Sequence, residues 1–89
     1  MRKAVSVQMI TTTGCDRCRE VEERLVYAAK KAGVIIVMQY FDSATDEAIH
    51  LGIQHGLDDV PSLVISGQPF CGTDFSDQNL IDTMMKACS

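Results

Sequence analysis

The 89-residue chain has no tryptophan, only two prolines and no long apolar run. Without a run of about 18 apolar residues, the sequence predicts no membrane-spanning helix. It also contains no internal repeat, linker or low-complexity segment, which at this length predicts a single domain over residues 1–89. Apolar residues make up 46% of the chain and charged residues 22%, as in a folded globular protein.

Clusters of basic residues are also scarce. The formal net charge is −4, and no basic patch is interleaved with aromatic residues. Proteins that bind phosphate backbones rely on clustered lysine and arginine. The composition therefore argues against nucleic acid as the main partner.

The N-terminal residues do not have the pattern of a secretion signal. They begin with the basic pair Arg2-Lys3, but the apolar part that follows is short and is interrupted by Ser6 and Gln8. The segment alternates as a strand does, and no cleavage site follows it. We expect a cytoplasmic protein, in which four cysteines indicate redox or metal chemistry more than a disulfide framework.

Two of the cysteines, Cys15 and Cys18, are separated by two residues at the start of a predicted helix. Free backbone N–H groups and the helix dipole stabilise a thiolate at this position. We expect them to lower the pKa of Cys15 and to make it reactive near neutral pH. Cys18 lies one turn further on, on the side that faces the protein. The spacing predicts attack by Cys15 and resolution by Cys18.

A C-x-x-C motif can also supply two of the four thiolates of a zinc site. Small copper chaperones likewise place this motif before a helix, and their chains continue with a β-hairpin. Here the chain continues with a predicted helix over residues 46–55 and then Val60-Pro61. This order favours redox chemistry, so we predict no metal site.

The apolar periodicity predicts the element order β-α-β-α-β-β-α. Apolar runs predict strands over residues 3–10 and 34–41, and apolar steps of three and four predict a helix over residues 16–32 between them. Because a long helix separates the two strands, they are expected to be parallel, with a right-handed connection. The second helix is expected over residues 46–55.

The second half predicts a hairpin and a final helix. Strands over residues 62–66 and 69–71 are expected to be antiparallel about the turn Gly67-Gln68, with Pro69 marking an edge strand. The final helix is expected to be capped by Ser76 or Asp74. Its buried face is expected to comprise Leu80, Ile81, Met84, Met85 and Cys88.

Across nearly the whole chain, this order resembles the thioredoxin and glutaredoxin superfamily. Two motifs carry the resemblance, namely Cys15-Asp16-Arg17-Cys18 at the first helix and Val60-Pro61 at the third strand. The resemblance implies an α/β, thioredoxin-like fold with a mixed four-stranded sheet flanked by three helices. It also implies that Cys15 is the nucleophile, Cys18 the resolving thiol and Pro61 a cis-proline beside the disulfide.

The expected substrate contact is the backbone of Val60. A cis bond is tolerated mainly before proline, and it turns the Val60 backbone outward, where an extended substrate segment can pair with it. Asp58 and Asp59 precede this dipeptide. They are interpreted as part of a solvated loop, and the alternative is that they tune substrate preference.

A further resemblance concerns the glutaredoxins, whose G-G-C-D motif near the last helix binds glutathione. The segment 71–74 matches that motif at Gly72 and Asp74. Backbone N–H groups at a helix N-terminus there can hold a carboxylate. Gly72, Thr73 and Asp74 are therefore candidate substrate-binding residues and glutathione a candidate co-substrate, while no tightly bound cofactor is expected.

The chain also departs from both family patterns. Thioredoxins commonly carry tryptophan before the first cysteine and Gly-Pro between the two, whereas this chain has Gly14 and then Asp16-Arg17. Met9 occupies the position of their buried aspartate, and the proline-tyrosine pair of glutaredoxins is missing. Arg17 favours a thiolate at Cys15 and Asp16 opposes it, so these two neighbours act on the pKa of Cys15 in opposite directions.

The sequence therefore predicts a thiol-disulfide oxidoreductase that acts as a monomer on protein or low-molecular-weight disulfides. The expected electron donor is a thioredoxin reductase or glutathione. Two alternatives stay open: a metal carrier that uses the C-x-x-C motif, and a non-catalytic thioredoxin-like binding module.

Overall fold

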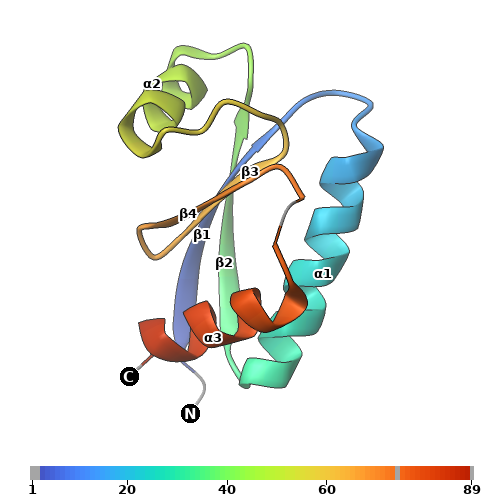
Figure 1. Cartoon of the computed structure of the whole chain (residues 1–89), viewed down its shortest axis with the longest axis vertical. Coiled ribbons are helices and arrows are strands. Elements are labelled where there is room, and N and C mark those ends of the chain that lie inside the picture. The colour runs from blue at the N-terminus through green and yellow to red at the C-terminus, as the bar shows by residue number, and fades with distance from the viewer. Residues whose placement is uncertain (1–2, 74, 89) are drawn as a thin grey trace.

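A mixed four-stranded sheet organises the computed structural model, which describes residues 3–73 and 75–88 (Figure 1). The strands are β1 (Ala4–Thr11), β2 (Ile35–Asp42), β3 (Ser62–Ile65) and β4 (Gln68–Cys71). Their order across the sheet is β2-β1-β3-β4. β1 and β2 are parallel, whereas β3 is antiparallel to both β1 and β4. The predicted parallel pair, the hairpin and the edge position of Pro69 are confirmed.

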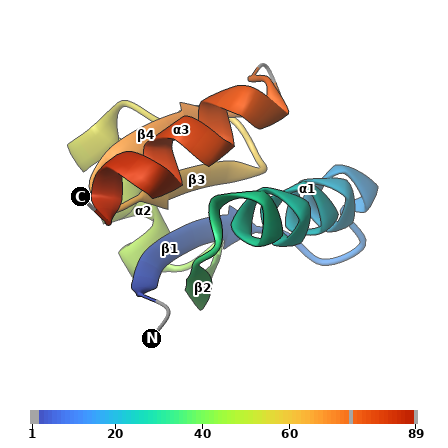
Figure 2. The same cartoon turned by 90° about the horizontal axis from the view of Figure 1, so that it is seen from below.

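Three helices among the described residues complete the fold. They are α1 (Asp16–Ala32), α2 (Asp46–His55) and α3 (Asp77–Ala87). Figure 2 shows α1 and α3 beside each other, and the Arg24 side chain on α1 donates to Asp77 at the start of α3. None of the helices in the described ranges is long and apolar enough to cross a membrane.

The two faces of the sheet pack against different helices because side chains alternate along a strand. Met9 and Leu63 face the main core, which α1 and α3 complete. Ile10 and Val64, the next residues along the two strands, belong to a smaller cluster with Ala48 and Leu51 of α2. α1 and α3 therefore cover one face of the sheet, and α2 covers part of the other.

The hairpin turn differs by one residue from the prediction. Ile65 pairs with Gln68, so the turn residues are Ser66 and Gly67, with φ angles of 48° and 89°. A two-residue turn with positive φ at both positions matches the twist of the strands it joins, and Gly67 adopts that conformation without strain. β4 consequently begins at Gln68 rather than at Pro69.

The last helix differs from the prediction at one core position. Ser76 is its N-cap, while Asp74 lies outside the described residues. Leu80 and Met84, one turn apart, are buried, but Met85 is 54% exposed because the next position along the helix turns away from the core. The prediction that Met85 is buried was wrong.

Candidate active site

Cys15 is the N-cap residue of α1, and a disulfide joins it to Cys18. The two Cα atoms are 5.3 Å apart. Cys15 is half-buried, whereas Cys18 is only 5% exposed and packs into the main core. Cys15 is thus the more accessible of the two cysteines.

The start of α1 directs a backbone donor at Cys15. The Cys18 N–H donates to Cys15 Sγ, with N and Sγ 3.1 Å apart. This N–H has no backbone acceptor within the helix, because it lies in the first turn. When the disulfide is reduced, the N–H favours negative charge on the Cys15 sulfur. Asp16 in the first turn opposes that effect, since its carboxylate carries like charge.

Gly14 shapes the loop that leads from β1 to Cys15. Its φ of 74° lies in the left-handed region, where a side chain would strain the backbone. The glycine is therefore required by this loop conformation. The thioredoxin pattern places tryptophan at this position, so this chain departs from that pattern here in sequence.

The Val60-Pro61 peptide bond is cis, as predicted. Pro61 is buried and Val60 is half-buried at the end of the loop that precedes β3. Arg17 Nη2, from within the C-x-x-C motif, donates to the Val60 carbonyl oxygen at 2.6 Å. This contact shows that the fold brings together the two motifs, which are far apart in the sequence.

Asp59 has a structural role that the sequence interpretation missed. Its Oδ1 accepts the Val60 N–H at 2.8 Å and lies 3.4 Å from Arg17 Nη2. Asp59 was interpreted as part of a solvated loop, and its half-exposed side chain is in fact paired across the site. The available signal was charge complementarity, since one motif contains Arg17 and the other is preceded by acids.

The candidate glutathione segment is arranged differently from the expectation. Gly72 is buried, and its N–H donates to the Pro61 carbonyl oxygen at 2.8 Å. Thr73 is exposed, and Asp74 lies outside the described residues. Because α3 begins only at Asp77, Gly72 does not lie at a helix N-terminus, and its N–H is already occupied.

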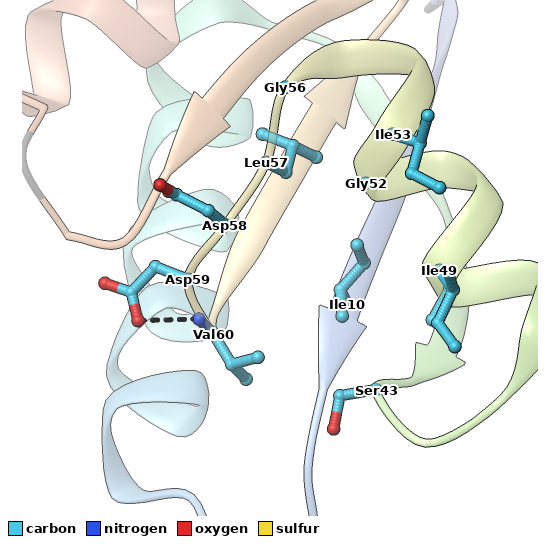
Figure 3. Close-up of a pocket in the computed structure, with 11 residues that line it drawn as sticks. Ile10, Ser43, Ile49, Gly52, Ile53, Gly56, Leu57, Asp58, Asp59 and Val60 are labelled. Atoms are coloured by element: carbon cyan, nitrogen blue, oxygen red, sulfur yellow. Dashed lines mark hydrogen bonds between the residues drawn. The ribbon is translucent and has the colours of Figure 1, made fainter.

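An open apolar groove adjoins Val60 on the side of α2. Figure 3 shows Ile49 and Ile53 of α2 on one side, Leu57 and Val60 on the other, and Ile10 between them. The groove has a volume of about 680 Å³. Its most exposed apolar side chain is Ile53, at 77%. The sequence spacing within α2 did not predict the groove. Apolar residues occur both on the buried side of this short helix, at Ala48 and Leu51, and on its exposed side, at Ile49 and Ile53.

A smaller hollow lies beside the disulfide. The residues that line it include Thr12, Gly14, Cys15 and Glu22.

One tyrosine next to this hollow's Glu22 has a shifted pKa. The pKa of Tyr40 on β2 is raised, first by desolvation and then by the Glu22 carboxylate.

The remaining cysteines form neither a second disulfide nor a metal cluster. Cys71 and Cys88 are free, and Cys71 Sγ donates to Asp58 Oδ1 at 3.3 Å. Within residues 3–73 and 75–88, no group of three or more histidine, cysteine, aspartate or glutamate side chains is placed to hold a metal ion.

Comparisons with known proteins identify the fold. No protein-family model matches the chain, and no curated protein matches it. Among solved structures, an uncharacterised thioredoxin-like protein from Clostridium perfringens is 18% identical, with a TM-score of 0.66 over 98% of this chain and 73% of its own.

Two thioredoxins match as well. The germline-specific Drosophila thioredoxin Deadhead is 24% identical, with a TM-score of 0.61 over 94% of this chain and 81% of its own. Fasciola hepatica thioredoxin is 17% identical, with a TM-score of 0.58 over 97% of this chain and 83% of its own. The chain therefore has a thioredoxin-like fold.

Proposed function

We propose that this chain is a thiol-disulfide oxidoreductase in which Cys15 is the nucleophile and Cys18 the resolving thiol. One observation carries the proposal: a half-buried Cys15 caps α1, and a buried Cys18 lies within disulfide distance behind it. The adjacent Val60-Pro61 loop supplies backbone groups beside this pair. An inert structural disulfide needs neither the helix N-terminus nor the adjacent backbone groups.

The proposed reaction proceeds by two thiolate attacks. The Cys15 thiolate attacks one sulfur of the substrate disulfide, so a mixed disulfide forms, the substrate S–S bond breaks and the departing thiolate takes a proton from solvent. Cys18 then loses its proton and attacks Cys15 Sγ, which forms the Cys15–Cys18 disulfide and releases the second substrate thiolate to be protonated. Two electrons pass from the dithiol to the substrate.

The proposed substrate contact is the backbone of Val60. Its N–H and C=O precede β3, which begins at Ser62, so the sheet ladder does not use them. Arg17, two residues after the nucleophile, contacts this backbone directly. An extended peptide that pairs with Val60 would therefore present its own disulfide near Cys15.

The electron donor and the compartment are also proposals. A dithiol donor such as a thioredoxin reductase is preferred, because the Gly72 N–H that would support a glutathione site is occupied by Pro61. Glutathione remains the alternative donor. The free thiols of Cys71 and Cys88 are consistent with a reducing, cytoplasmic location, and the protein is proposed to act as a monomer.

Turnover of a small disulfide tests the proposal. Hydroxyethyl disulfide would be reduced with dithiothreitol as donor, and the rate with wild-type protein compared with those of Cys15→Ser and Cys88→Ser. We expect acceleration that is lost in Cys15→Ser and retained in Cys88→Ser, because only Cys15 reacts with substrate. Equal rates for wild type and Cys15→Ser would contradict the proposal.

A further inference from the structure

Both backbone groups of Val60 are occupied by charged side chains. The N–H donates to Asp59 Oδ1 at 2.8 Å, the bond drawn in Figure 3, and the C=O accepts from Arg17 Nη2 at 2.6 Å. Arg17 and Asp59 are themselves 3.4 Å apart. These three contacts, which we call the Val60 cap, cover the backbone that a peptide substrate would pair with.

The surroundings hold Asp59 in this position. Gly72 lies against its carboxylate, and a Cβ at Gly72 would come within 3.0 Å of Asp59 Oδ2. The Gly72 N–H bond to the Pro61 carbonyl oxygen fixes the two loops relative to each other. The absence of a side chain at Gly72 therefore leaves the space that the carboxylate fills.

The two halves of the cap differ in how strictly they exclude a peptide. A carbonyl oxygen has two lone pairs, so the Val60 C=O can accept from Arg17 and from a peptide N–H together. The Val60 N–H has one hydrogen, so a peptide carbonyl must take it from Asp59. Asp59 is thus the residue that a pairing peptide has to displace, and Arg17 is the cation that holds it.

We propose that Asp59 is a specificity-determining residue that caps the Val60 N–H against extended peptides. Peptide disulfides react after displacing the Asp59 carboxylate, whereas small disulfides reach Cys15 without pairing to Val60 and react with the cap closed. This inference rests on the proposed oxidoreductase function. It adds a basis for discrimination between two substrate classes at the same nucleophile.

The test compares two substrates that both contain mercaptoethanol in their disulfide, so that attack on the peptide sulfur of the second releases the same thiol as attack on the first. One is hydroxyethyl disulfide, and the other is an unstructured peptide of neutral residues whose single cysteine is in mixed disulfide with mercaptoethanol. The variants are Asp59→Ala, Asp59→Asn and the matched control Asp58→Ala. Asp58 carries the same charge one residue away, but its carboxylate contacts Cys71 and not Val60.

The measured quantity is the ratio of kcat/KM for the peptide to kcat/KM for the small disulfide. Relative to Asp58→Ala, we expect Asp59→Ala to raise this ratio about three- to tenfold, the range for a half-exposed, charge-assisted hydrogen bond. Asp59→Asn should raise it less, because its amide oxygen still accepts the N–H without the charge. The Val60 amide should also exchange with solvent faster in Asp59→Ala than in Asp58→Ala.

Two other outcomes are distinguishable. The same ratio in Asp59→Ala and Asp58→Ala, with Cys15-dependent turnover intact, would overturn the cap while leaving the proposed function in place. A wild-type protein without Cys15-dependent turnover of either substrate would overturn the proposed function and this inference with it.

Discussion

The Cys18 N–H donates to Cys15 Sγ across the first turn of α1, with the two atoms 3.1 Å apart. The same turn leaves Cys15 half-buried and places Cys18 in the core. A substrate that approaches from solvent therefore meets Cys15 first. The two cysteines are chemically identical residues, and the roles proposed for them differ because of their positions at the start of one helix.

Replacing the resolving cysteine should trap the intermediate. Reduced Cys18→Ser, treated with hydroxyethyl disulfide, should keep one mercaptoethanol adduct at Cys15, because the thiol that forms the internal disulfide with Cys15 has been removed. Wild type should release it and form the internal disulfide. Intact-mass measurement and peptide mapping locate the adduct, and an adduct on Cys71 with none on Cys15 would contradict the assignment.

Gly72→Ala should disturb Asp59, whereas Gly67→Ala should not. Both glycines have positive φ, so each substitution should lower the free energy of unfolding by about 1–3 kcal/mol. Only at Gly72 does the new Cβ meet another group, Asp59 Oδ2 at 3.0 Å. We expect the Val60 amide to exchange faster in Gly72→Ala than in Gly67→Ala. Equal exchange in the two variants would show that the carboxylate adapts without releasing Val60.

Arg24→Ala should weaken the packing of α1 against α3. Arg24 Nε lies 2.8 Å from Asp77 Oδ1, and the guanidinium lies over the Phe75 ring at 4.6 Å from its centroid. The loss should be about 1–2 kcal/mol in urea unfolding. Arg19→Ala removes the same charge from an exposed position of α1 and should change stability by less than about 0.5 kcal/mol. Equal losses would contradict the assigned contacts.

Leu25→Ala tests the core that anchors α1. Leu25 is fully buried in the main core, so its truncation should cost about 2–5 kcal/mol of unfolding free energy. Val26, the next residue, is half-exposed, and Val26→Ala should stay within about 0.5 kcal/mol of wild type. Chemical denaturation measures both. A small loss for Leu25→Ala would show that the helix is anchored elsewhere.

Helices with one clear apolar stripe were predicted well. The helix over residues 16–32 has the predicted bounds, because Cys18, Val21 and Leu25 fall on one face and the motif at its start is polar. The strand positions were predicted to within a residue or two. The hairpin register was predicted wrongly, because the turn lies at Ser66 and Gly67 and not at Gly67 and Gln68. Pro69 suggested the start of a strand, whereas the backbone required positive φ at Ser66 and Gly67.

The candidate site was predictable only in part. The C-x-x-C pair is a short local motif, whereas the cis Val60-Pro61 bond was predicted from the family resemblance that the two motifs carry together. Asp59 is paired with Arg17 and lies against Gly72, and both residues are distant from Asp59 in the sequence. These contacts therefore depend on how the loops pack. No local pattern distinguishes a paired carboxylate from an unpaired one, so the pairing of Asp59 within its exposed loop was not predicted.

The reduction potential of the Cys15–Cys18 pair tests the central claim most directly. Purified protein would be equilibrated with glutathione redox buffers and its free thiols counted, in wild type and in Cys15→Ser. We predict a two-electron, Cys15-dependent transition between about −270 mV, typical of a thioredoxin, and about −200 mV, typical of a glutaredoxin. If no Cys15-dependent disulfide formed at any buffer ratio, the oxidoreductase function would be contradicted.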